Sequence, residues 1–112
     1  MVRGEVWAAV WPADPGKKER PVLVVSNNIR NRNPYLLDVV VAKVTSAERA
    51  AGSIKPINPA EDEAIVLKKA SIVKCAALFS VEKSTLRRKL TDLSPGLMTQ
   101  VDAKLRNLLN LP

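Results

Sequence analysis

The stretch E-R-P-V-L-V-V-S-N-N-I-R-N-R, residues 19–32, decides the fold of this chain. Its apolar run V-L-V-V is unbroken, which predicts a strand over Pro21–Ser26 that is buried on both faces. A turn-rich segment, 27–34, follows and has room for one helical turn. Arg20 stands immediately before this strand, so we expect the sheet to fix its position.

Further apolar runs on either side predict more strands. Val2–Trp11 is a candidate first strand and Leu36–Val44 a candidate third strand. The remaining candidates are Ser53–Ile57, Ala64–Leu67, Ser71–Ser80 and Leu86–Thr91. Short strands at irregular spacing, with no internal repeat, predict a small and strongly bent antiparallel sheet.

The end of the chain changes to a helical period. Ser94 suits an N-cap, Pro95 suits the first helical position, and the predicted helix continues towards Asn110. One stripe of this helix is apolar and consists of Leu97, Met98, Val101, Leu105, Leu108 and Leu109. We expect this stripe to pack on the sheet. The predicted fold is therefore mainly β (α+β), a small antiparallel barrel with a C-terminal amphipathic helix.

Composition and charge limit the function. The 112 residues suit one domain, 1–112, and carry a net charge of +7, which favours polyanionic partners. Histidine is absent, so acid–base catalysis and metal binding by imidazole are excluded. The single cysteine, Cys75, allows no internal disulfide and is expected to be a small buried apolar residue. This cysteine usage, and an N-terminus without the apolar core of a signal peptide, favour a cytoplasmic location.

Several side chains suit the recognition of a phosphate. The planar and permanently charged fork of Arg20 fits phosphate oxygens, and the hydroxyl groups of Thr45 and Ser46 can donate hydrogen bonds to them. Arg20 is a poor base, because its pKa exceeds 12. Glu19 and Asp38 are the carboxylates nearest to these strands in sequence, and the general base stays unassigned.

Separated pieces of the chain resemble the MazF/PemK (Kid) family of toxin endoribonucleases. The opening V-R-G-E-V-W-A-A-V-W-P and the stretch 19–32 are similar to the family's first two strands. V-V-V-A-K-V-T-S, residues 39–46, is similar to its third strand. I-V-K-C (72–75) resembles a later strand, and L-T-D-L-S-P (90–95) with the helix resembles the C-terminus. The pieces occur in the family's order and cover nearly the whole chain.

The resemblance implies an SH3-like, CcdB/PemK-like barrel, usually a homodimer, that is encoded beside an acidic antitoxin. It implies cleavage of single-stranded RNA without a metal or other cofactor, leaving a 2′,3′-cyclic phosphate and a 5′-hydroxyl. The family's functional arginine matches Arg20, and its hydroxyl pair matches Thr45 and Ser46. These three are the predicted catalytic residues. The predicted RNA-binding residues are Lys18, Arg30, Arg32 and Lys74.

The chain also departs from the family pattern. Ala76 stands where some members carry an aspartate proposed to transfer protons, and Phe79 stands where arginine is common. These departures keep open a second hypothesis, a non-enzymatic inhibitor of DNA gyrase like CcdB. A third hypothesis is a small RNA-binding barrel without chemistry.

Other residues have simpler interpretations. The aromatic side chains of Trp7, Trp11 and Tyr35 could stack on bases, but we expect packing in a core or an interface. The run Arg87-Arg88-Lys89 is expected to be a solubilising surface and is left out of the predicted site.

Overall fold

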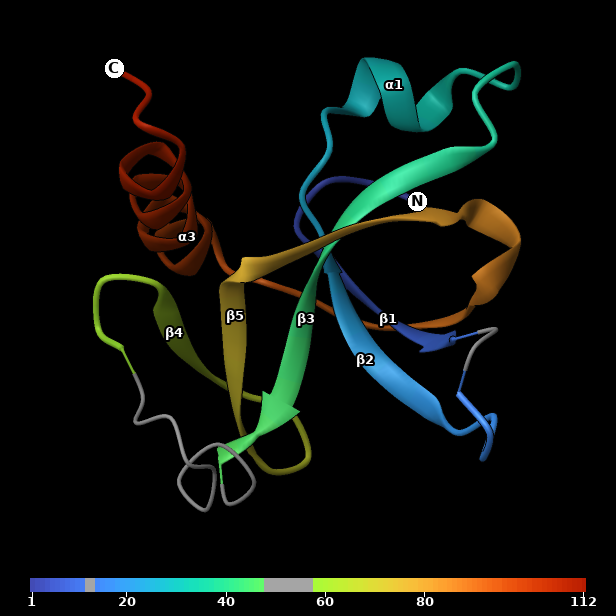
Figure 1. Ribbon diagram of the computed structural model, residues 1–112, viewed down its shortest axis with the longest axis horizontal. Helices are drawn as coiled ribbons and strands as arrows, with labels where there is room; N and C mark the ends of the chain where they lie inside the picture. Colours follow the sequence, from blue (N-terminus) through green and yellow to red (C-terminus); the bar gives the residue numbers. More distant parts are fainter. Residues whose placement is uncertain (12–13, 48–57) are drawn as a thin grey trace.

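A computed structural model describes residues 1–11, 14–47 and 58–112 of the chain. The elements in chain order are β1 (Glu5–Val10), β2 (Glu19–Val24), α1 (Asn28–Arg32), β3 (Asp38–Ser46), β4 (Asp62–Val66), β5 (Ala70–Glu82), the 3₁₀ turn η1 (Lys83–Thr85), β6 (Leu86–Asp92) and α3 (Pro95–Leu109). The predicted mainly β fold with a C-terminal helix is confirmed (Figure 1). No helix among the described residues is long and apolar enough to span a membrane.

The strands form one six-stranded sheet in the order β4-β5-β3-β2-β1-β6, and every neighbouring pair is antiparallel. The long strand β5 bends sharply in the middle (Figure 1). At the bend the register with β3 shifts, because Ala42 faces Leu78 whereas Lys43 already faces Lys74. Extra residues in one strand of a pair bend that strand and increase its twist. The first half of β5 therefore pairs with β4, and the sheet curls on itself.

Two groups of buried residues stabilise the curled sheet. The first group lies under α3 and includes Leu23, Val44, Cys75 and Val101. The second lies on the opposite face of β2 and includes the side chains of Ala9, Val22, Val24, Val39, Val41 and Leu86, with Trp7 and Trp11 packed against them. Val22, Leu23 and Val24 are each 0% exposed, so the strand is buried on both faces, as its sequence predicts.

Helix α3 begins where the sequence predicts. The Ser94 hydroxyl accepts a hydrogen bond from the Leu97 N–H at 3.2 Å, and Pro95 occupies the first turn. The helix ends at Leu109, and its C-cap, Asn110, adopts a left-handed conformation with φ of 56°. Val101 is fully buried and Leu97, Met98 and Leu105 pack beside it, as predicted for the apolar stripe, whereas Leu109 at the end of the stripe is 53% exposed.

Some strand boundaries differ from the prediction. β3 spans Asp38–Ser46 and not Leu36–Val44, so the hydroxyl pair belongs to the strand and does not follow it. β4 begins at Asp62, because two acidic side chains join the strand. The helical turn expected within 27–34 is α1. The candidate strand Ser53–Ile57 lies outside the described residues.

Candidate active site

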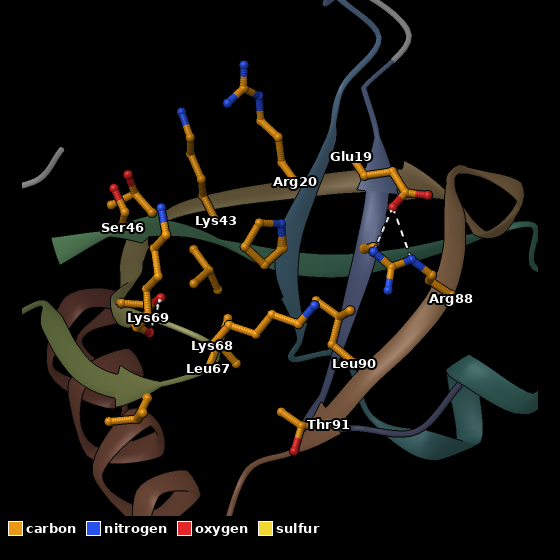
Figure 2. A pocket seen from close by; sticks show the side chains of 16 residues that line it. Glu19, Arg20, Lys43, Ser46, Leu67, Lys68, Lys69, Arg88, Leu90 and Thr91 are labelled. Carbon is orange, nitrogen blue, oxygen red and sulfur yellow. Dashed lines mark hydrogen bonds and ion pairs between the residues drawn. The ribbon is translucent and has the colours of Figure 1, made fainter. Parts of the chain in front are cut away.

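A pocket of about 950 Å³ lies where the two edge strands of the curled sheet approach each other. Its walls include residues of β4 and the β4–β5 turn on one side, and residues of β6 on the other (Figure 2). The ends of β2 and β3 lie between them. The lining residues are Ala8, Glu19, Arg20, Pro21, Lys43, Val44, Thr45, Ser46, Val66, Leu67, Lys68, Lys69, Ser71, Arg88, Leu90 and Thr91. All three predicted catalytic residues are therefore brought to one cavity.

Arg20 is the second residue of β2 and keeps about a third of its side chain exposed. Its Nε donates a hydrogen bond to Oδ2 of Asp14 at 3.1 Å. The other oxygen of that carboxylate accepts from the Gly16 N–H at 3.0 Å. This backbone hydrogen bond, and then the one from Arg20, hold the pKa of Asp14 below its usual value. The carboxylate therefore stays ionised beside the guanidinium at neutral pH.

The strand register relates Arg20 to the hydroxyl pair. Val22 faces Lys43 and Leu23 faces Ala42 across β2 and β3. Arg20 and Thr45 each lie two residues beyond the last of these pairs, Val22 and Lys43, on their own strands. Because side chains alternate along a strand, those of Arg20, Lys43 and Thr45 belong to the same face. Figure 2 shows the Arg20 and Lys43 side chains extending in the same direction.

The pocket also contains four cations that are not among the predicted site residues, namely Lys43, Lys68, Lys69 and Arg88. With Arg20 they give the lining five cationic groups against one carboxylate, Glu19. Lys43 carried a usable signal, because it is the one charge inside the apolar strand V-V-V-A-K-V. Lys68 and Lys69 form the turn between β4 and β5, so their place in the pocket depends on how the sheet curls.

Arg88 was left out of the predicted site, and the structure places it in the pocket wall. Its Nη2 lies 3.0 Å from Oε2 of Glu19, and its Nε donates to the same oxygen at 3.1 Å (Figure 2). β1 separates the two strands that carry these residues. Only the sheet order, which the sequence does not show directly, brings the pair together.

The four predicted RNA-binding residues lie outside the pocket lining. Lys18 is exposed in the loop just before Glu19. The Lys74 Nζ donates to Oδ2 of Asp62 at 2.8 Å, and the Asp62 side chain is only 2% exposed. Lys74 thus neutralises a buried carboxylate in the fold.

The two arginines of α1 lie at the other end of β3. Arg30 forms an ion pair with Asp38, the first residue of that strand, and Arg32 is exposed. Roughly 25 Å of extended chain separates Asp38 from Ser46 at the pocket end. Asp38 is therefore remote from the candidate site, and Glu19 is the carboxylate that lines it.

The remaining sequence candidates are structural or exposed. The Trp11 ring packs edge-on against Phe79 with centroids 5.1 Å apart. Tyr35 is 89% exposed, so it does not pack in the core of this chain. Cys75 is fully buried, and burial raises the pKa of its thiol to about 11. No group of three or more potential metal ligands is found among the described residues.

Comparison with known proteins identifies the class to which this fold and pocket belong. A family model described as PemK-like, MazF-like toxin of type II toxin–antitoxin systems matches residues 2–109. The chain belongs to this family. Within it, the chain is a MazF-like endoribonuclease toxin.

Individual relatives match the chain over nearly their whole length. Endoribonuclease MazF1 of Mycobacterium bovis is 27% identical over 111 residues, covering 99% of this chain and 94% of the relative. Endoribonuclease MazF4 of Mycobacterium tuberculosis shows the same values. A solved endoribonuclease in complex with its cognate antitoxin, from a mycobacterial species, superposes with a TM-score of 0.77 at 26% identity, covering 100% of this chain and 97% of that one. MazE–MazF of Deinococcus radiodurans, with a TM-score of 0.72, 20% identity and coverage of 100% and 97%, shares the fold.

Proposed function

We propose that this toxin cleaves single-stranded RNA in the pocket, without a metal, through attack by the RNA's own 2′-hydroxyl. The products would carry a 2′,3′-cyclic phosphate and a 5′-hydroxyl. One observation supports the proposal most strongly. The pocket lining contains all three predicted catalytic residues together with four further cations and a single carboxylate, that of Glu19.

Arg20 is proposed to stabilise the charge that develops on the phosphorane. Its Nε is bound to Asp14, and the side chain is partly exposed on the face that it shares with Lys43. A well-placed donor of this kind typically contributes about 3–4 kcal/mol of transition-state stabilisation. Lys43 would add a second positive charge beside it.

Thr45, which shares the face of Arg20, is proposed to hold the scissile phosphate for in-line attack, with Ser46 as the neighbouring hydroxyl on the other face of the strand. Both belong to a paired strand, because Thr45 faces Ile72 and Ser46 faces Ser71 on β5. A rigid strand is a better support than a loop for such positioning. Glu19 lines the pocket and Asp38 does not, so Glu19 is the candidate proton acceptor.

The excess of positive charge also supports an acidic partner. We propose that a cognate acidic antitoxin covers the pocket and that the toxin acts in the cytoplasm as a homodimer. Three large apolar side chains near α1, those of Ile29, Tyr35 and Leu37, are 88%, 89% and 72% exposed and offer a surface for the second copy.

The test is cleavage of a long single-stranded RNA in the presence of EDTA, with the 5′ ends of the products mapped. We expect discrete cuts with 5′-hydroxyl ends, and no cut at a site whose 2′-hydroxyl is replaced by hydrogen. Arg20→Ala should slow cleavage by a few hundredfold or more, because it removes the main charge on the phosphorane. Arg106→Ala is the matched control, since Arg106 is exposed on α3 and outside the pocket lining.

Three outcomes would contradict the proposal in different ways. Loss of cleavage in EDTA would oppose a metal-independent reaction, and wild-type rates for Arg20→Ala would oppose the role of Arg20. Bound but intact RNA would indicate a binding module without chemistry. Blocked gyrase supercoiling with intact RNA would favour the gyrase inhibitor, a hypothesis that the family match does not support.

A further inference from the structure

Asp14 is unusually well fixed for a residue in a loop. Its N–H donates to the Trp11 carbonyl at 3.0 Å, and its own carbonyl accepts from the Lys17 N–H at 3.0 Å. Its Oδ1 accepts from the Gly16 N–H at 3.0 Å, which closes a tight turn. Lys17 takes a positive φ of 46° to complete that turn. Two backbone hydrogen bonds therefore fix the Asp14 main chain, and a third holds one oxygen of its carboxylate.

The second carboxylate oxygen of Asp14 is directed at Arg20. Oδ2 accepts from the Arg20 Nε at 3.1 Å, and the Asp14 side chain is only 17% exposed. Nε is the inner nitrogen of the guanidinium group. A hydrogen bond at Nε fixes the last side-chain torsions and the plane of the group, while the two outer nitrogens extend further along the side chain. Figure 2 shows these nitrogens of Arg20 pointing away from the strand that carries it.

We propose that Asp14 is a positioning residue for catalysis: its turn presents one carboxylate oxygen to the Nε of Arg20 and orients the guanidinium for the phosphate. This inference rests on the proposed function, because it requires Arg20 to act on the RNA. Asp14 contacts no reacting atom itself. A long arginine side chain has many rotamers in solution, so an orienting partner reduces the entropy lost when the phosphate binds.

The substitution Asp14→Asn separates the two hydrogen bonds of the carboxylate, the one from Gly16 and the one from Arg20. An asparagine side chain has one oxygen, which can keep the hydrogen bond to the Gly16 N–H and so preserve the turn. Its amide nitrogen is a donor only and cannot accept from the Arg20 Nε. Asp14→Asn should therefore leave folding unchanged and lower kcat by about 10- to 100-fold, since a small misplacement of a catalytic group has effects of this size. KM should change by less than about threefold, because the other pocket cations still bind RNA.

Two measurements exclude a merely structural role. In the Arg20→Lys background, Asp14→Asn should have no further effect on kcat, because Asp14 acts only through the guanidinium. In an NMR spectrum of arginine Nε–H groups, the Arg20 signal, identified by its loss in Arg20→Lys, should be slow to exchange in the wild type. The same signal should exchange fast in Asp14→Asn. Asp102→Ala is the matched control, because Asp102 pairs with Arg3 at 2.6 Å outside the pocket.

These experiments distinguish a failure of the proposed Arg20 role from a failure of the proposed Asp14 role. If Arg20→Ala cleaves RNA at the wild-type rate, the proposed role of Arg20 is wrong. If Arg20→Ala is inactive while Asp14→Asn keeps full kcat, only the role of Asp14 is wrong. An unchanged Arg20 Nε–H signal in Asp14→Asn, or an equal loss of kcat in the Arg20→Lys background, would also overturn the positioning role.

Discussion

Lysine side chains have different roles in the pocket and in the contact between β4 and α3. In the β4–α3 contact, Asp62 and Glu63 have side chains that are 2% and 8% exposed. Each has a cationic partner, because Lys74 of the neighbouring strand β5 binds Asp62 at 2.8 Å and Lys104 of α3 forms an ion pair with Glu63. In the pocket, by contrast, Lys43, Lys68 and Lys69 form no ion pair with any carboxylate in the described part of the chain.

The difference follows from the cost of removing charges from water. A buried carboxylate is tolerated only when a cation and hydrogen bonds compensate its lost hydration. A cluster of like charges is tolerated only at a solvated surface, where it repels itself modestly and attracts polyanions. Lysine in the β4–α3 contact is therefore part of the fold, whereas lysine at the pocket is available to a ligand.

The largest expected effect is on stability. Lys104→Met keeps the apolar stem but leaves Glu63 without its cation, and the Asp62 carbonyl loses its hydrogen bond from Lys104 at 2.6 Å. Breaking a buried ion pair typically costs about 3–5 kcal/mol, and we expect the lower end because the Lys104 side chain is still 20% exposed. Urea unfolding should report this loss, with kcat of the folded protein unchanged.

Lys69→Met is the matched substitution in the pocket. It removes the same charge from an exposed turn residue, so the free energy of unfolding should change by less than about 0.5 kcal/mol. Equal destabilisation by the two substitutions would show that the contrast between the two regions is false.

The next effect concerns Cys75, which lies in the core group under α3. Burial raises the pKa of its thiol to about 11, so at pH 8 the folded protein should react with a thiol reagent at least about a hundredfold more slowly than the urea-unfolded chain.

The pKa of the Cys75 thiol in the folded protein also lies above its value of about 8.5 in the unfolded chain, so stability depends on pH. The corresponding stability is complete below pH 8.5 and is lost as the pH rises towards 11. Because the chain has one cysteine, the whole signal comes from this site. Fast reaction of the folded protein at pH 8 would contradict the burial.

Local patterns were sufficient to predict most of the fold. The run V-L-V-V predicts a strand covered on both faces, since a strand exposed on one face would alternate with polar residues. Ser94 and Pro95 predict the start of α3, because an N-cap hydroxyl and a first-turn proline satisfy purely local requirements. The start of β4 was missed, because Asp62 and Glu63 look like solvated residues until Lys74 and Lys104 approach them from other elements.

The candidate site was predicted where a motif of a single strand marks the residue, and it was mostly missed where the curl of the sheet brings the residue in. Arg20, Thr45 and Ser46 were recognised from motifs at strand ends, and all three line the pocket. Lys69 and Arg88 enter the same pocket only because β5 bends and the sheet curls, so no local pattern places them there. Charge alone could not distinguish the pocket cations from those of α1 or β5, because the sequence does not show which lysine or arginine has a carboxylate partner in the fold.

The smallest expected effect tests whether the pocket cations bind phosphates. Lys43→Gln should weaken binding of a single-stranded RNA that lacks the attacking 2′-hydroxyl, by about fivefold at 0.1 M salt, because one phosphate contact and its released counterion are lost. The slope of log affinity against log salt should fall in magnitude by about 0.7 for the same reason. Arg106→Gln removes one charge from the exposed part of α3 and should leave the slope unchanged. If RNA were attracted only by the net charge of +7, the two variants would show equal slopes. A changed slope in Lys43→Gln alone would therefore locate the RNA backbone at the β3 end of the pocket, and equal slopes would place it elsewhere.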